Sequence, residues 1–460
     1  MILTEDQASR ISSDGLIHDA ERLKELQALP LERKIGISTA RIIEWYQYWN
    51  GNVYVSFSGG KDSTVLLHLV RSIFPDVPAV FSNTGLEYPE LQKFVKSFDN
   101  VITLYPKIGF REVISTYGYP LISKEVAEAI YYARRIKPQN TGGGYSRPQT
   151  GNVQNSRDCE RIQGSNSKTQ RPTRNTGGGV SRNESSKERP AQPPLHDWRR
   201  MVLLGSCPPP GTDWHNWRMA CLCNAQKQFG EKSVFNKEKW LPIARDLPVP
   251  ISHYCCNIMK KQVMNKYAHE TGRKPIIGTM TEESRMRKQA WIRHGCNAFD
   301  SKKASSQPLS FWTEQDVLTY IKLFELEIAP VYGDINIVDS KGNIVETEEA
   351  GMPEGCKWAC SKCTRTGCIY CAFGVHLEKG ETRFQRLAKT HPRQYEYCIG
   401  GGQWVDNPAY DPTASMEPDE MGWVNYNPKK IFVPSKEGIG LGTVFKMANE
   451  VMGYELYRWE

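Results

Sequence analysis

Short apolar runs that alternate with helical segments early in the chain constrain the fold more than any other feature. The runs lie at residues 53–57, 77–81 and 101–105, and each has the length and composition of a buried strand. Residues 64–74 and 89–98, which separate them, have the length and composition of helices. Strands that alternate with helices predict a parallel sheet with crossover helices, so we expect an α/β fold with a doubly wound parallel sheet.

The loop Ser58–Ser63, with the sequence SGGKDS, joins the first apolar run to the first helix. Its glycines allow a sharp turn in which successive N–H groups point at one anion, and the helix adds its positive N-terminal end. The spacing of a Walker A loop is absent. We therefore predict a nucleotide phosphate site of another type, with a tight turn that binds nothing as the alternative. Its residues are Ser58, Gly59, Gly60, Lys61, Asp62 and Ser63.

A second polar loop, Ser82–Glu90, follows the next apolar run. Ligands of doubly wound sheets bind at the carboxyl ends of the parallel strands. We therefore expect Asn83, Thr84 and Gly85 to face the same crevice as the first loop and to contact the nucleotide. A plain turn explains Asn83 equally well.

Composition divides the chain into six segments. They are a helical N-terminal segment (1–50), the first part of a nucleotide-binding domain (51–136), a low-complexity insertion (137–195), the second part of the domain (196–330), a Cys-rich cluster-binding region (331–400) and a C-terminal extension (401–460). The insertion is rich in Gly, Ser, Asn, Gln, Arg and Pro and poor in large apolar residues, so we expect it to be disordered.

The net charge of +8 is concentrated in the insertion. Residues 137–190 hold ten Lys or Arg against four Asp or Glu, a net +6, which leaves +2 for the rest of the chain. We expect this segment to be either a solvated spacer or an arm that binds a nucleic-acid acceptor. The sequence has no apolar stretch of the roughly 20 residues that cross a bilayer, and residues 1–10 lack the pattern of a secretory signal. These features predict a cytoplasmic enzyme without a membrane partner.

Thirteen cysteines, an odd number spread over 460 residues, do not form a disulfide framework. The doublet Cys255-Cys256 lies far upstream of the pair Cys368-x2-Cys371. Together the two pairs supply four thiolates, the number that a [4Fe–4S] cluster needs. We predict these four residues as its ligands.

The other cysteines leave several alternatives open. Cys356, Cys360 and Cys363, with Cys368, can form a small zinc knuckle. The spacing of the first three also matches the cluster motif of radical S-adenosylmethionine enzymes, although those enzymes carry it early in a barrel and not late in the chain. Four further thiols are expected to be buried and inert. They are Cys207, Cys221, Cys223 and Cys296.

These motifs resemble the iron–sulfur class of the phosphoadenosine phosphosulfate (PAPS) reductase family, within the superfamily of adenine nucleotide alpha-hydrolases and PP-loop ATP pyrophosphatases. The loop SGGKDS is similar to the pyrophosphate-binding loop of that superfamily, and the second loop to the Asp-Thr-Gly…Pro-Glu element of the reductases, with Asn83 in the place of Asp. Residues 255–261, 278–287 and 308–318 are also similar to the family, and the details look most like variants from phages and prophages.

The resemblance covers residues 50–135 and 245–385 and implies an adenine nucleotide alpha-hydrolase-like sheet with a Cys-rich iron–sulfur C-terminal region. It also implies that Ser284 and Arg287 open a helix that borders the nucleotide. We predict a binding role for Ser284 and a catalytic role for Arg287, because a guanidinium binds phosphate or sulfate oxygens in bidentate fashion. A solvated helix face is the alternative.

Two departures from the family favour ATP as the nucleotide. The sequence lacks the Glu-Cys-Gly-Leu/Ile-His motif that carries the reductases' catalytic cysteine, and it keeps the full SGGKDS loop, which in reductases is usually degenerate. We therefore predict cleavage of ATP between its α and β phosphates, coupled to sulfur chemistry. Lys61 is expected to stabilise the leaving pyrophosphate. Asp62 is expected to hold Mg²⁺ or, alternatively, to be only an acid at a helix N-terminus.

Two other functions remain open. The first is a true reductase that forms sulfite from PAPS or adenosine phosphosulfate (APS), with Cys398 or an outside thiol as nucleophile and a thiol reductant as partner. The second is a non-catalytic module that binds a nucleotide or, through residues 137–190, a nucleic acid.

Overall fold

The computed structural model describes residues 18–134, 221–223, 226, 231, 233, 235–301, 303–346, 352–418 and 423–460. The predicted insertion 137–195 and Cys207 lie outside these residues. Within them, none of the helices combines the length and apolarity needed to cross a bilayer.

A six-stranded sheet in the order β3-β2-β1-β5-β7-β6 forms the centre of the first half of the molecule. All neighbouring strands are parallel except the edge pair β6 and β7. The strands are β1 (Val53–Ser56), β2 (Ala79–Ser82), β3 (Val101–Leu104), β5 (Lys274–Ile277), β6 (Asn297–Ala298) and β7 (Ser305–Ser306). The three predicted apolar runs are thus the strands β1, β2 and β3.

Helices cover both faces of this sheet, as side-chain alternation along β1 requires. Val53 and Val55 face a core that also contains α4 (Lys61–Arg71) and α5 (Pro89–Lys96), whereas Tyr54 packs against Tyr267 on the opposite face. Tyr267 belongs to α12 (Gln262–Thr271). The sheet is therefore doubly wound, and the predicted fold class is confirmed.

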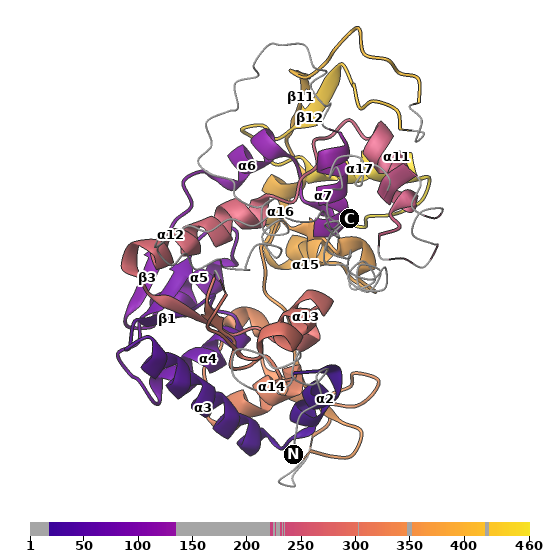
Figure 1. Cartoon of the computed structure of the whole chain (residues 1–460). Coiled ribbons are helices and arrows are strands. Elements are labelled where there is room, and N and C mark those ends of the chain that lie inside the picture. The colour runs from indigo at the N-terminus through magenta and orange to yellow at the C-terminus, as the bar shows by residue number, and fades with distance from the viewer. Residues whose placement is uncertain are drawn as a thin grey trace, which may run out of the picture.

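The first core extends below the sheet in Figure 1 to helices of the N-terminal segment and of residues 285–323. These helices are α2 (Ala20–Ala28), α3 (Leu31–Tyr48), α13 (Arg285–His294) and α14 (Glu314–Leu323). A buried ion pair between Lys34 of α3 and Asp316 of α14, 2.6 Å long, ties the N-terminal helices to this core. Asp316 also completes a capping box with Thr313.

A second hydrophobic core lies above the first in Figure 1. Its helices are α6 (Phe110–Tyr117), α7 (Lys124–Ala133), α11 (Leu241–Asp246), α15 (Arg383–Thr390), α16 (Pro392–Ile399) and α17 (Leu441–Met452). The last sixty residues, which show no clear period in the sequence, contribute α17 with five buried residues. They also contribute the antiparallel pair of β11 (Gln403–Asp406) and β12 (Lys430–Val433).

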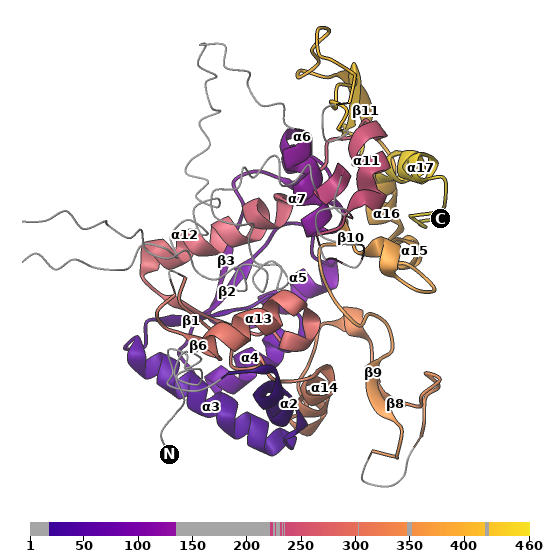
Figure 2. The ribbon, with the colours of Figure 1, turned by 45° about the vertical axis from the view of Figure 1, so that its right-hand side comes forward.

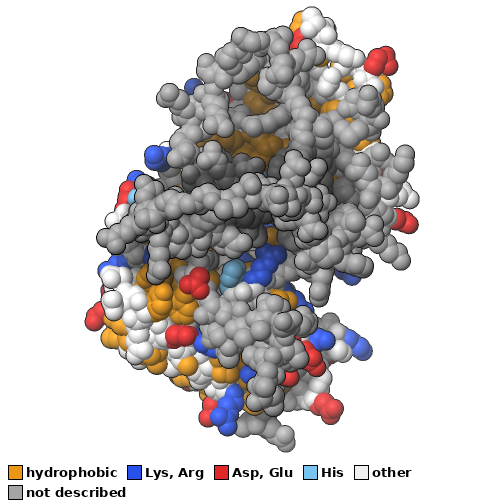
Figure 3. All heavy atoms as spheres, viewed as in Figure 1, with side chains coloured by type: hydrophobic (Ala, Val, Ile, Leu, Met, Phe, Trp, Pro, Cys, Tyr) orange, Lys and Arg blue, Asp and Glu red, His pale blue; other side chains and the backbone are white. Residues whose placement is uncertain are grey.

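Two small sheets lie between or beside the cores. The parallel pair of β4 (Leu121–Ile122) and β10 (Ala372–Phe373) belongs to the second core. The antiparallel pair of β8 (Ile335–Val338) and β9 (Lys357–Cys360) extends away from the body in Figure 2. In Figure 3, acidic and basic side chains are interspersed over the lower half of the visible face, without a continuous basic patch.

Candidate functional site

The chain reverses its direction of winding at β1, and the phosphate loop lies at that point. β2 and β3 follow on one side of β1 and β5 lies on the other, so the carboxyl ends of β1 and β5 form the switch point at which such sheets bind ligands. The loop Ser58–Ser63 leaves β1 and runs into α4, which begins at Lys61. Gly278, after β5, lies so close that a Cβ atom there would be 3.0 Å from the carbonyl oxygen of Asp62.

The loop is folded tightly on itself. Gly59 has a φ of +73°, and a Cβ atom at this position would lie 2.6 Å from Val95 and 2.9 Å from Leu91. Only glycine fits both requirements. The Ser63 hydroxyl accepts a hydrogen bond from the Ser58 amide at 3.2 Å and donates one to the Gly60 carbonyl at 2.8 Å. The serine hydroxyls therefore hold the shape of the loop.

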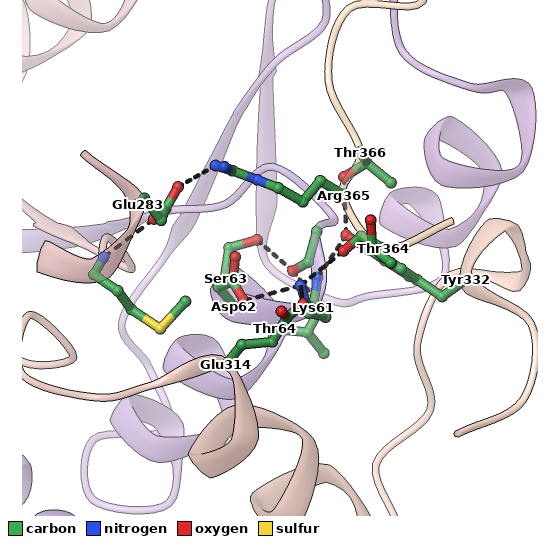
Figure 4. Close-up of polar contacts among 12 residues, drawn as sticks. Lys61, Asp62, Ser63, Thr64, Glu283, Glu314, Tyr332, Thr364, Arg365 and Thr366 are labelled. Atoms are coloured by element: carbon green, nitrogen blue, oxygen red, sulfur yellow. Dashed lines mark hydrogen bonds and ion pairs between the residues drawn. The ribbon is translucent and has the colours of Figure 1, made fainter. Parts of the chain in front are cut away.

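Lys61 is 3% exposed and is surrounded by acceptors (Figure 4). Its Nζ lies 3.1 Å from a carboxylate oxygen of Glu314 and 3.6 Å from Asp62, and it donates to the carbonyl of Thr364 at 3.0 Å. Burial by itself would lower the pKa of Lys61, but the carboxylates of Asp62 and Glu314 outweigh burial and raise it. The ammonium is therefore fully charged at neutral pH.

Asp62 has an incompletely satisfied carboxylate. Its Oδ1 is buried and lies 3.6 Å from the Lys61 ammonium, but it accepts no hydrogen bond from the described residues. Burial raises the pKa of Asp62, and the nearby carboxylates of Glu283 and Glu314 raise it further, against the opposing effect of Lys61 and Arg365. A buried carboxylate oxygen without a donor, beside a phosphate loop, is suited to hold a cation such as Mg²⁺.

A pocket of about 210 Å³ opens beside the loop at the carboxyl ends of β1 and β2. Strand ends, the second loop, α12 and a segment after β9 contribute to its wall. The lining residues are Ser56, Phe57, Ser58, Val80, Phe81, Ser82, Glu87, Leu91, Lys260, Met264, Thr366 and Gly367. The carboxylate of Glu87 is buried and lies 3.1 Å from the Lys260 ammonium.

The second loop contributes differently from the prediction. Asn83 accepts a hydrogen bond from the Gly85 amide at 3.0 Å, which is the contact of a local turn. The Thr84 hydroxyl is hydrogen-bonded to Glu87 at 2.8 Å. Thr84 and Gly85 line a separate pocket of about 540 Å³, on the side of α6. Glu87, which the sequence did not single out, lines the pocket at the phosphate loop together with Ser82.

Ser284 and Arg287 lie at the start of α13, as predicted. The Ser284 hydroxyl caps the helix by accepting from the Arg287 amide at 3.3 Å. The Arg287 guanidinium is paired with Glu283, which also binds Arg365. Glu283 in turn raises the pKa of Asp62, so Arg287 is linked to the phosphate loop through the carboxylate of Glu283.

The four cysteines predicted as cluster ligands influence one another's pKa. Cys255 and Cys256 precede a π-helical turn at Asn257–Lys261, a few residues after Ile251, which bridges to Tyr119. Cys368 and Cys371 form a turn before β10, which pairs with β4 at residues 121–122. Each of the four thiols perturbs the ionisation of at least one other. Both cysteine segments are thus attached to the same stretch of chain, residues 119–122.

The thiols are crowded and mostly protonated. Burial raises the pKa of Cys371 and raises that of Cys368 to about 12. The Cys255 thiol donates a hydrogen bond to Cys256, which raises the pKa of Cys255 and lowers that of Cys256. The ammonium groups of Lys124 and Lys260 favour the Cys256 thiolate further.

The donor set fits an iron–sulfur cluster in its chemistry. Among the residues that the structure describes, no three Cys, His, Asp or Glu side chains have the geometry of a formed metal site. The mutual perturbation of the four thiols nevertheless puts them in one neighbourhood, with basic side chains beside them. Iron would stabilise their thiolate forms, and Lys124, Lys260 and Arg383 would offset the negative charge of the thiolates.

Two predictions for the other cysteines are wrong. Cys356 directly precedes β9 and Cys360 is its last residue, so the extended strand separates their Cα atoms by about 13 Å. They therefore do not converge with Cys363 in a zinc knuckle. Cys398 is fully buried in the second core and burial raises its pKa well above the usual value, so it does not meet a substrate as a thiolate nucleophile. Cys221 and Cys296 are buried, as predicted, and Cys223 is partly buried.

Comparisons with known proteins match the parts of the chain that carry both centres. Residues 52–123 and 222–373 match the family model of the phosphoadenosine phosphosulfate reductase domain. An uncharacterized protein of Methanocaldococcus jannaschii is 32% identical over 109 residues, which are 23% of this chain and 26% of that protein. A phosphoadenosine 5'-phosphosulfate reductase of Salmonella arizonae is 30% identical over 95 residues, 21% of this chain and 36% of the enzyme.

These curated relatives are matched over little more than a third of their own length at most. Among solved structures, a PAPS reductase of Candida auris in complex with phosphate covers 68% of this chain and 90% of its own, with 10% identity and a TM-score of 0.26. The family model spans the strands β1, β2, β3, β5 and β7, the phosphate loop and all four clustered cysteines. Residues 52–123 and 222–373 therefore form a domain of the phosphoadenosine phosphosulfate reductase family.

Proposed function

We propose that this protein binds ATP with its phosphate tail on the loop Ser58–Ser63 and cleaves it between the α and β phosphates. The observation that carries the proposal is the intact loop at the switch point of the sheet, beside an unsatisfied Asp62 oxygen. The start of α4 offers amide donors and a positive helix end to the phosphates. The adenosine binds in the adjoining pocket, at the carboxyl ends of β1 and β2.

The proposed chemistry is positioning and charge stabilisation. Water attacks the α-phosphorus and forms the new bond of AMP, while Lys61 and the loop amides stabilise the pyrophosphate that leaves. Asp62 holds Mg²⁺, which neutralises phosphate charge when it is bound. Arg287 serves the phosphate oxygens once Glu283 releases it.

The second part of the proposal concerns sulfur. Cys255, Cys256, Cys368 and Cys371 hold a [4Fe–4S] cluster, which supplies a binding place or an electron path for sulfur when it is present. Lys260 connects the two centres, since it lines the nucleotide pocket and lies within electrostatic range of Cys368. A product of ATP cleavage would therefore form close to the cysteine centre.

A sulfonucleotide reductase that forms sulfite from PAPS or APS is the second candidate. It is favoured by the relatives, which are named phosphoadenosine 5'-phosphosulfate reductases. Because Cys398 is buried, the nucleophile of such a reductase would be an outside thiol or another cysteine of this chain. The nucleic-acid arm predicted at residues 137–190 lies outside the described residues and is not part of either candidate.

Radiolabelled nucleotides separate the candidates. Iron-replete protein incubated with MgATP and a thiol reductant is expected to release pyrophosphate and AMP, and Lys61→Ala is expected to abolish the release. Sulfite released from PAPS or APS, with no cleavage of ATP, would replace the first candidate by the second.

A further inference from the structure

Residues 361–367, here called the strap, lead from the end of β9 across the phosphate loop to Cys368 (Figure 4). The first part of the strap is fixed along residues 331–334. The amides of Ser361, Lys362 and Cys363 donate to carbonyls of that segment at 2.8, 3.1 and 3.3 Å. The second part, residues 364–367, contacts the phosphate loop and the nucleotide pocket.

Tyr332 and the strap take up the donors that a phosphate would need. The Tyr332 hydroxyl accepts a hydrogen bond from the Lys61 amide at 3.1 Å, and the Thr364 carbonyl accepts one from the Lys61 ammonium at 3.0 Å. The amide at the start of a helix is the donor that anions use. The Thr366 hydroxyl is hydrogen-bonded to Tyr332 at 2.9 Å and holds the phenol in place.

The space beside the loop is also limited by the strap. Thr366 and Gly367 form part of the wall of the 210 Å³ pocket. Pockets for ligands of drug size start at about 300 Å³. A Cβ atom at Gly60 would already lie 3.3 Å from both Thr366 and Tyr332, so the strap lies directly on the loop. An adenosine with a phosphate tail needs more room than this closed arrangement leaves.

We propose that Tyr332 and the strap close the phosphate loop in the nucleotide-free protein, and that a pyrophosphate group opens it by taking the Lys61 amide and ammonium from them. This inference rests on the proposed nucleotide function and adds a basis for specificity. Hydrogen bonds to an anionic oxygen are stronger than those to a neutral phenol or carbonyl, so the phosphate tail displaces both. AMP lacks the terminal phosphates that reach Lys61 and leaves the strap closed.

The position of the strap also links the two centres. Gly367 is adjacent to Cys368, so a strap that moves off the loop moves the backbone beside a predicted cluster ligand. A cluster bound at Cys368 and Cys371 would therefore also change the equilibrium between the open and closed strap, because coupling between two sites is reciprocal. Tyr332 is therefore a positioning residue that acts through Lys61, with no role in the chemical step.

The substitution Tyr332→Phe tests the closure, because it removes the hydroxyl and keeps the buried ring. We expect the variant to bind inorganic pyrophosphate and MgATP about fivefold more tightly than the wild type, the factor for one lost competing hydrogen bond. Affinity for AMP is expected to stay the same. Tyr320→Phe is the matched control, since Tyr320 is also buried and its hydroxyl is bonded to His68, at a distance from the loop.

Equal or weaker binding by Tyr332→Phe would overturn the inference, since weaker binding means that the hydroxyl contacts the ligand. If neither the wild type nor the variant binds any phosphate ligand, the proposed nucleotide function fails as well. Binding by the variant alone would support the closure strongly.

Alkylation of Cys363, adjacent to Thr364, gives a second readout without turnover. Its thiol donates to the Arg365 carbonyl at 2.8 Å in the closed strap. Pyrophosphate is expected to raise the rate of alkylation in the wild type severalfold, and AMP to leave it unchanged. A rate that pyrophosphate does not change, in protein that binds pyrophosphate, contradicts an opening strap.

Discussion

The phosphate loop and the cysteine centre differ in how far the chain itself satisfies their polar groups. In the loop, Ser63 and Lys61 have hydrogen-bond partners within the chain, and Asp62 Oδ1 has the Lys61 ammonium at 3.6 Å but no hydrogen bond from the described residues. In the cysteine centre, four acidic groups are crowded together and perturb one another's ionisation. The loop therefore adopts its shape without its ligand. The four thiols, in contrast, can all ionise to thiolates only when a cation lies among them.

Loss of the cluster is the largest effect that this comparison predicts. We expect anaerobically purified wild type to hold about four iron atoms per chain and Cys256→Ser to hold less than about one. Cys356→Ser, at the far end of β9, is the matched control and is expected to keep its iron. Iron analysis and the visible spectrum measure both. Zinc in place of iron in the wild type would contradict the cluster.

Removal of the loop ammonium is expected to have the next largest effect. Lys61→Ala deletes a charged donor to the phosphates and is expected to weaken MgATP binding by about 10- to 100-fold. The iron content is expected to stay unchanged, because Lys61 belongs to the other core. Lys266→Ala, which removes an exposed lysine of α12 paired with Glu270, is the control. Equal affinities of both variants would mean that the phosphates bind elsewhere.

Substitutions at two glycines with similar backbone angles distinguish the effect of backbone strain on stability from the effect of steric fit. Gly59 and Gly272 have similar positive φ values, +73° and +71°, but only a Cβ atom at Gly59 would collide with neighbouring side chains. We expect Gly59→Ala to lower the free energy of unfolding by about 1–3 kcal/mol more than Gly272→Ala. Denaturant titration measures the difference. A larger loss for Gly272→Ala would contradict the tight packing of the loop against α5.

The smallest effect concerns the charge of Asp62. Its pKa is raised in the folded protein, so ionisation of this carboxylate costs stability at pH values above the raised pKa and costs nothing below the ordinary value of 3.8. Asp62→Asn is therefore expected to melt at a slightly higher temperature than the wild type at pH 7, with a difference that shrinks as the pH falls. It is also expected to lose the Mg²⁺ dependence of ATP binding. A lower melting temperature at pH 7 would show that the ion pair with Lys61 dominates.

The sequence predicts the fold and the loop well because their signals are local. β1, β2, β3 and their helices each follow from a short run of residues, and the order of such runs fixes a parallel sheet. The loop Ser58–Ser63 lies entirely between two of these elements. The four cysteines were predicted from a family resemblance and from the number of thiolates that a [4Fe–4S] cluster needs. No local pattern joins residues 255–256 to 368–371.

The residues that the sequence missed are held in place by long-range packing. Tyr332 ends a short 3-10 helix, and Thr364 and Thr366 belong to an irregular segment. The β8–β9 pair, which lies between them in the sequence, brings them onto the loop. Glu87 and Lys260 face the pocket as a pair, although neither is unusual in the sequence. Asn83 was predicted to contact the nucleotide, but its side chain bonds the adjacent turn, which its residue type favours equally.

Calorimetric titration of MgATP into iron-replete wild type and Lys61→Ala tests the phosphate loop most directly. We expect the wild type to take up one nucleotide per chain, and the variant to bind at least about tenfold more weakly. No uptake of ATP, PAPS or APS by the wild type, or equal uptake by the variant, would contradict a phosphate site at Ser58–Ser63.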